Sequence, residues 1–296
     1  DLPLNVSRSA LQNDGFVKKI SDYITKKVAD KLTGMYKTEK ESYEKYWDDI
    51  NPFIKFGYIK DEKFREKIQD YMIFKDLNGK YLTLPECIED AKETHENTIY
   101  YVTDEKEQSQ YINMFKAQGT NAVILPHNID SPFIQQIEQA NENLHFKRID
   151  AESDTYKEKL SDEEAESLKA DAEALGEVFK KALKNDSLQV KAEKLKDDNT
   201  ASMITVSEES RRMQEMFRMY GMGGDTSMFG AEGQTLILNI NHPLVQAVLA
   251  DKEGEMTPAI CEQLYDLALL SHGSLSPERM TAFISRSNEL MMKLAK

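Results

Sequence analysis

The chain has 296 residues, of which 38 are Lys or Arg and 52 are Asp or Glu, so its net charge at pH 7 is −14. A field of this sign repels phosphate backbones and anionic lipid, which argues against nucleic acid and membrane surfaces as partners. The length predicts about two domains, and no stretch approaches the roughly 20 consecutive apolar residues of a membrane helix.

The first third of the chain predicts helices. Apolar residues recur every three or four positions from Phe16 to Tyr36, which is typical of one face of an amphipathic helix. Two further helices are expected at Glu41–Ile50 and Lys63–Met72. Breaks are expected at Asn51-Pro52 and at Gly57, because proline and glycine interrupt helices.

The middle of the chain alternates strands and helices. Short β-rich runs at Thr98–Thr103, Asn121–Leu125 and Leu144–Ile149 are separated by segments of helical length. This order predicts a small three-stranded parallel βαβαβ unit with right-handed crossovers. Acids then crowd between Ala151 and Lys184, where we expect a solvated linker followed by the first helix of a second domain.

The last third predicts a mixed α+β domain, so the fold class is α/β to α+β. Its expected elements are strands at Leu188–Leu195, Ser202–Val206 and Thr235–Ile240, a Met-rich helix at Glu208–Tyr220, a glycine-rich loop at Gly221–Gly233, and helices at Pro243–Leu249, Pro258–Leu270 and Pro277–Leu294. The last two form an apolar helix pair at the chain end. Such a pair commonly packs with that of a second copy as a four-helix bundle.

Two apolar surfaces are candidate interfaces. On the Met-rich helix, Met213, Met216, Phe217 and Tyr220 share one face. Such a stripe usually packs in a core, but flexible thioethers beside a glycine-rich loop also suit a surface that accepts many partners. On the terminal helix pair, the residues expected at a dimer interface are Leu264, Leu267, Leu270, Phe283, Ile284, Leu290 and Met291.

The sequence carries no clear catalytic constellation. The turn at Thr103–Glu107 has acids and no glycine where a phosphate would bind, which favours a structural sheet over a nucleotide site. The five histidines are scattered singly, so no metal site is expected. The distant Cys87 and Cys261 suit a reducing, cytoplasmic compartment better than a disulfide.

One alternative stays open at this point. A stand-alone α/β enzyme or ligand-binding protein would place its site at the strand ends near Thr103 and Pro126. The only side chains there with suitable chemistry are Asp104 and His127.

Several segments together resemble a known family from end to end of the chain. They are Asp1–Gln12, Thr98–Asp104, the helix Arg212–Met219, Leu236–Val245 with its Asn-His-Pro, and Leu264–Leu270 followed by Gly273. In this order they are similar to the heat-shock protein 90 family of molecular chaperones, among them the bacterial high-temperature protein G. At the middle-domain site where some bacterial members expose a tryptophan after an Asp for client contact, this chain departs from the pattern and has Ser131-Pro132-Phe133.

The resemblance implies a layout and an ATP contact. Residues 1–157 would be the distal middle domain and residues 158–296 the C-terminal dimerisation domain, with the N-terminal ATP-binding domain absent from this chain. In the family the loop arginine, here Arg8, reaches the γ-phosphate of ATP held by that domain, and Gln12 assists. This chain alone would then bind no cofactor and would not be an enzyme, whereas the whole protein would use ATP and Mg.

The resemblance also implies the partners. They are a second copy in a homodimer, partly folded client proteins, and the protein's own ATPase domain. Clients would contact the Met-rich stripe of Met213, Met216, Phe217 and Tyr220. The expected role is that of a cytoplasmic heat-shock chaperone in the stress response.

Overall fold

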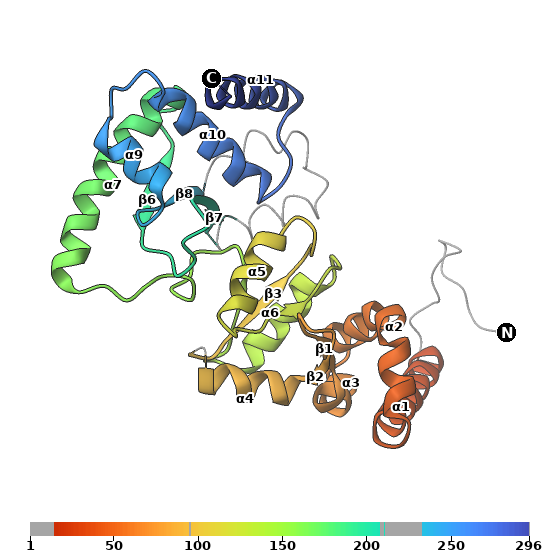
Figure 1. Cartoon of the computed structure of the whole chain (residues 1–296). Helices are drawn as coiled ribbons and strands as arrows, with labels where there is room; N and C mark the ends of the chain where they lie inside the picture. The colour runs from red at the N-terminus through yellow and green to blue at the C-terminus, as the bar shows by residue number, and fades with distance from the viewer. Residues whose placement is uncertain (1–14, 95, 208–209, 211–232, 296) are drawn as a thin grey trace. The chain divides into compact units, whose positions relative to one another are not determined.

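The computed structural model describes residues 15–94, 96–207, 210 and 233–295 (Figure 1). Contacts divide the chain into two compact units. Unit 1 comprises Asp1–Thr103 and Val123–Phe146, and unit 2 comprises Asp104–Ala122 and Lys147–Lys296. These units interleave along the chain, whereas the expected domains 1–157 and 158–296 are contiguous, so the position of that domain boundary stays a prediction.

Unit 1 opens with helices, as expected. They are α1 (Gly15–Thr38), α2 (Lys40–Lys60), α3 (Glu62–Ile68) and the 3₁₀ turn Gln69–Tyr71. Helix α1 buries Ala29 and Leu32, and the core continues through Tyr43, Trp47 and Ile68. The predicted first helix is therefore confirmed, with its ends within two residues of those expected, but the predicted apolar face is buried only at Leu32, since Ile24 is 55% and Val28 44% exposed.

The predicted break in α2 is wrong, because the helix runs through Pro52 and Gly57. Proline lacks the N–H that would donate to the Asp48 carbonyl one turn earlier. The side-chain amide of Asn51 replaces it, since Nδ2 donates to the carbonyl oxygen of Asp48 at 3.1 Å. A Cβ at Gly57 would lie 3.0 Å from the Phe64 ring, so the glycine admits the close approach of α3.

The predicted parallel βαβαβ unit is confirmed. Strands β3 (Thr98–Val102), β4 (Val123–Ile124) and β5 (His145–Arg148) form a sheet in the order β4-β3-β5. Tyr101 pairs with Val123 in the parallel register, and the crossovers contain α5 (Ser109–Ala117) and α6 (Asp130–Ala140). Three short elements precede the sheet: β1 (Ile73–Lys75), β2 (Tyr81–Thr83) and α4 (Leu84–Thr94).

Unit 2 is the expected mixed α+β domain. Besides α5, its elements are α7 (Asp162–Leu183), β6 (Gln189–Glu193), β7 (Ser202–Val206), β8 (Gln234–Asn239), α9 (Pro243–Ala250), α10 (Thr257–Leu270) and α11 (Pro277–Leu294). Strand β8 lies between β6, to which it is parallel, and β7, to which it is antiparallel. The core joins Leu175, Phe179, Leu236, Leu238 and Leu264.

The expected solvated linker is wrong for the segment before α7. Ala151 and Tyr156 are buried, and the Tyr156 hydroxyl accepts a hydrogen bond from the Ser153 N–H at 3.0 Å. Isolated bridges join Ala151 to Val206 and Lys157 to Leu195. The segment has few apolar residues, but Ala151 and Tyr156 are packed. Its acidic composition therefore did not reveal that the connection to α7 is structured.

Candidate dimer interface

Helix α10 has one buried and one exposed face. Cys261, Leu264 and Ala268 lie in the core of unit 2, at the spacing of three and four residues that keeps them on one side of the helix. Burial raises the pKa of the Cys261 thiol to about 12, so it stays protonated and is no nucleophile. Leu267 faces away from this core and is 45% exposed.

Helix α11 presents apolar side chains to the solvent in the single chain. Ile284 is 52% exposed, Met291 is 58% exposed and Met292 is 59% exposed. Phe283 and Leu290 are half-buried. Among the side chains of α11 that the structure describes, only that of Arg286 is buried. None of the apolar side chains described for the helix is therefore fully buried in unit 2, although Phe283 and Leu290 are covered in part.

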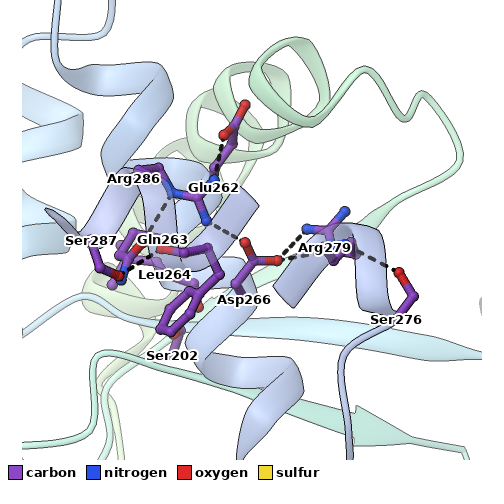
Figure 2. A network of polar contacts seen from close by, with 10 residues as sticks. Ser202, Glu262, Gln263, Leu264, Asp266, Ser276, Arg279, Arg286 and Ser287 are labelled. Carbon is purple, nitrogen blue, oxygen red and sulfur yellow. Dashed lines mark hydrogen bonds and ion pairs between the residues drawn. The ribbon is translucent and has the colours of Figure 1, made fainter. Parts of the chain in front are cut away.

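A polar cluster joins α11 to α10 (Figure 2). The Asp266 carboxylate of α10 accepts from Arg279 Nε at 2.9 Å through Oδ1 and from Arg286 Nη2 through Oδ2. Arg286 also donates from Nη1 to Glu262 Oε2 at 2.7 Å and from Nε to Gln263 Oε1 at 3.0 Å. Each hydrogen bond of the guanidinium fork therefore goes to the same neighbouring helix.

Further contacts surround this cluster at Arg279, Gln263 and Ser276. The Arg279 guanidinium lies over the Tyr265 ring, 4.9 Å from its centroid. Burial raises the pKa of Tyr265, and the nearby Arg279 charge opposes that shift in part. Gln263 Nε2 donates to Ser287 Oγ at 3.0 Å, and Ser276 Oγ caps α11 by accepting from the Arg279 N–H.

The seven residues predicted for a dimer interface differ in how exposed they are in the single chain. Leu267, Ile284 and Met291 are exposed, while Leu270, Phe283 and Leu290 are partly buried. Leu264 is only 1% exposed and packs in the core of its own unit, so it has almost no surface to offer a second chain. The term interface face below means Leu267, Ile284, Met291 and Met292.

Other predicted site residues lie outside the described part of the chain. These are Arg8 and Gln12 of the proposed ATP-contacting loop, and Met213, Met216, Phe217 and Tyr220 of the proposed client stripe. Their roles stay predictions. Phe133, in the segment Ser131–Phe133, is 0% exposed and packs against Tyr58 and Phe74. Phe133 therefore belongs to the core of unit 1.

The residues of the enzyme alternative have structural roles. Asp104 Oδ1 accepts from the backbone N–H groups of Lys106 at 2.8 Å and Glu107 at 3.0 Å, and these bonds lower the pKa of its carboxyl group. Asp130 Oδ2 accepts from the His127 backbone N–H, while the buried Lys55 pairs with Oδ1. Among the described residues, no three His, Cys, Asp or Glu are grouped so that they could hold a metal ion.

The sequence analysis missed the polar cluster between the helices. A signal was present, because Asp266 interrupts the apolar run Leu264–Leu270 and two arginines lie about two turns apart on the next helix. A carboxylate within an apolar helix face calls for a charged partner. Which of the many Lys and Arg residues supplies that partner depends on how the helices pack, which no local pattern specifies.

The fold defines a mixed α+β protein, and the candidate site is its terminal helix pair, with apolar side chains exposed on α10 and α11. No helix in the described part of the chain is both long and apolar enough to cross a membrane. The family model described as Hsp90 protein matches residues 1–296. The chain therefore belongs to the Hsp90 family, the chaperone family that its sequence motifs predict.

Curated relatives agree with this assignment. The chain is 37% identical over 273 residues to the chaperone protein HtpG of Bacteroides fragilis (strain YCH46), covering 88% of this chain and 39% of that protein. It is 34% identical over 278 residues to HtpG of Porphyromonas gingivalis (strain ATCC 33277), covering 88% and 40%. HtpG of Treponema denticola is 27% identical over 318 residues, covering 99% and 47%. The chain spans less than half the length of these relatives.

Proposed function

We propose that this chain is the dimerising and client-binding part of an ATP-driven Hsp90 chaperone. Family membership supports the chaperone role, and the exposed apolar side chains of α11 support dimerisation. The partner at the interface face is a second copy of the chain. The compartment we propose is the cytoplasm, in keeping with two buried free cysteines.

The observation that carries dimerisation is the burial pattern of α11. Helices in proteins gain most of their stability from packing an apolar face against other elements. Covering an Ile, Leu or Met side chain stabilises by about 1.5–3 kcal/mol relative to full exposure. Leu267, Ile284, Met291 and Met292 are each about half exposed, so covering them in a pair of copies would gain about half of this stabilisation from each side chain.

The remaining roles follow from the family and from residues outside the described ranges. We propose that Met213, Met216, Phe217 and Tyr220 contact partly folded clients. We also propose that Arg8 and Gln12 reach ATP and Mg held by a domain outside this chain, so that the chain alone does not hydrolyse ATP. A guanidinium suits this role because it keeps its charge and offers several donors to the phosphate.

Charge placed in the interface face tests dimerisation. We expect the double variant Leu267→Asp and Ile284→Asp to be monomeric, because two buried carboxylates without partners would oppose association. Sedimentation equilibrium at micromolar concentration gives the mass. Leu244→Asp is the matched control, since Leu244 is 44% exposed on α9, and it should stay dimeric.

Two results would contradict the proposal. One is an unmodified chain that sediments as a monomer throughout the micromolar range. The other is dissociation by Leu244→Asp to the same extent, which would mean that the interface face has no special role.

A further inference from the structure

We propose that Asp266 is a positioning residue of the dimer interface, which holds α11 in the orientation that presents Ile284 and Met291 to a second copy. This inference rests on the dimerisation proposed above. It goes beyond dimerisation because it says which residue sets the geometry of the interface. That residue, Asp266, is buried and does not belong to the interface face.

The first step is that α11 depends on the polar cluster for its attachment. Its one buried side chain in the described range is Arg286, and the hydrogen bonds of this residue all reach α10. Helix pairs are usually held by apolar ridges packed into grooves, and the crossing angle within one such packing class still varies by roughly 15–20°. Charged hydrogen bonds are shorter and more directional, so this attachment fixes α11 more narrowly.

The second step concerns where the two arginines lie on α11. Arg279 and Arg286 are about two turns apart on one side of the helix, and Asp266 receives both, one on each carboxylate oxygen. Two points of attachment along a helix fix its rotation as well as its position. At 100° per residue, Ile284 and Met291 lie roughly 120–160° around the helix from these arginines, which is on the far side of the helix from Asp266. The rotation fixed by Asp266 therefore sets the direction in which Ile284 and Met291 point.

The third step is the charge balance of the cluster. Two cations, Arg279 and Arg286, face two anions, Asp266 and Glu262. The Asp266 side chain is only 2% exposed, whereas that of Glu262 is 41% exposed and can exchange its partner for water. Removing the Asp266 charge alone would leave Arg286 buried with one exposed partner, and an uncompensated buried charge is strongly unfavourable. Asp266 is thus the member whose loss should release α11.

The variant Asp266→Asn tests the inference, since it removes the charge and keeps the shape. We expect the dimer dissociation constant, measured by sedimentation equilibrium, to rise by at least about tenfold. In hydrogen exchange, the amides of α11 should lose protection while those of β6, β7 and β8 keep it. The conservative variant Asp266→Glu should recover most of the affinity. Glu278→Gln, an exposed charge removal on α11, is the matched control and should change neither readout.

The outcomes separate this inference from the proposed function. If Asp266→Asn dimerises as tightly as the unmodified chain with α11 equally protected, the positioning role is wrong and dimerisation stands. If β6, β7 and β8 lose protection together with α11, Asp266 merely supports the fold and the inference is again wrong. A monomeric unmodified chain is recognised before any variant is made, and it removes the proposed dimer together with the inference.

Discussion

His272 lies buried next to a carboxylate that already has a partner. Its Nδ1 is 3.3 Å from Asp150 Oδ2, but no hydrogen bond forms at this buried nitrogen. Asp150 is held by Arg148, whose Nη2 donates to Oδ2 at 2.7 Å. Burial lowers the pKa of His272, the Asp150 charge opposes this, and the Arg148 charge adds to it. The charge of the exposed Glu107 also raises the pKa of the imidazole. Burial outweighs these opposing charges, so the net pKa is lowered and His272 is neutral in the folded unit 2 near pH 7.

This environment predicts a pH dependence of stability. Because the pKa of His272 is lower in the folded chain than its ordinary value of 6.5, unfolding takes up a proton as the pH falls. The stabilisation is therefore complete above about pH 6.5 and is lost progressively below it. We expect the urea midpoint of unit 2, followed by circular dichroism, to fall between about pH 7.5 and pH 5. His272→Gln should flatten that slope.

Asp150 also titrates differently in the folded and unfolded chain, but it does so at a more acid pH than His272. Burial would raise the pKa of Asp150, but Arg148 outweighs it and the net pKa is lowered, so its contribution is present above its ordinary value of 3.8 and is lost at more acid pH. The slope between about pH 7.5 and pH 5 thus reports on histidines. An unchanged slope in His272→Gln would show that another histidine titrates there and would contradict the assignment.

At the scale of the element, α2 shows how one side chain lets a helix tolerate proline. We expect Asn51→Ala to destabilise unit 1 by about 1–2 kcal/mol, because the Asp48 carbonyl loses its donor. The buried Asn51 Oδ1 has no partner, and its removal offsets part of this cost. Urea unfolding followed by the fluorescence of Trp47, the single tryptophan of the chain, measures the change.

The double variant makes this prediction specific. Replacing Pro52 by Ala restores a backbone N–H for the Asp48 carbonyl, so Asn51→Ala should cost less in a Pro52→Ala background. Equal costs of Asn51→Ala in the two backgrounds would mean that the amide does not substitute for the missing proline donor.

Elements with long apolar periodicity could be predicted, and short ones could not. The periodic spacing identified α1, and the proline at the start of α11 placed its first residue correctly. The hairpin of β1 and β2 was missed because each strand has only three residues. Its turn did carry a signal, Asn78-Gly79, where Gly79 has φ of 78° and the Asp76 carboxylate accepts from the N–H groups of Asn78 and Lys80.

For the whole molecule, the sequence predicted the site only in part. The apolar spacing grouped Leu267 on one apolar helix face and Ile284 and Met291 on another, because amphipathic periodicity is a local property, and the structure shows all three exposed in the single chain. It could not place Leu264 in the core of its own unit, nor find the pairing of Asp266 with Arg286, because both depend on the packing of helices against other elements. The family followed from motifs spread along the whole chain, which fold physics alone does not supply.

The last prediction concerns ATP and the whole chain. Backbone N–H groups at a strand-to-helix turn could bind phosphate, but in the turn after β3 Asp104 already accepts those of Lys106 and Glu107. The net charge of −14 also disfavours a polyanion. We therefore expect titration calorimetry of the chain with MgATP to show no binding.

Adding the ATP-binding domain of an HtpG relative as a separate chain distinguishes two possibilities. Either this chain stimulates ATP hydrolysis by that domain through Arg8, or it is an enzyme that acts alone. If Arg8 contacts the γ-phosphate, the mixture should hydrolyse ATP faster than that domain alone, and Arg8→Ala should abolish the increase. Lys19→Ala, an exposed charge removal on α1, is the control and should leave the increase intact. An increase that survives Arg8→Ala would assign stimulation to another surface of the chain. Hydrolysis by this chain without the added domain would instead favour the stand-alone enzyme, because the catalytic groups would then have to lie within these 296 residues.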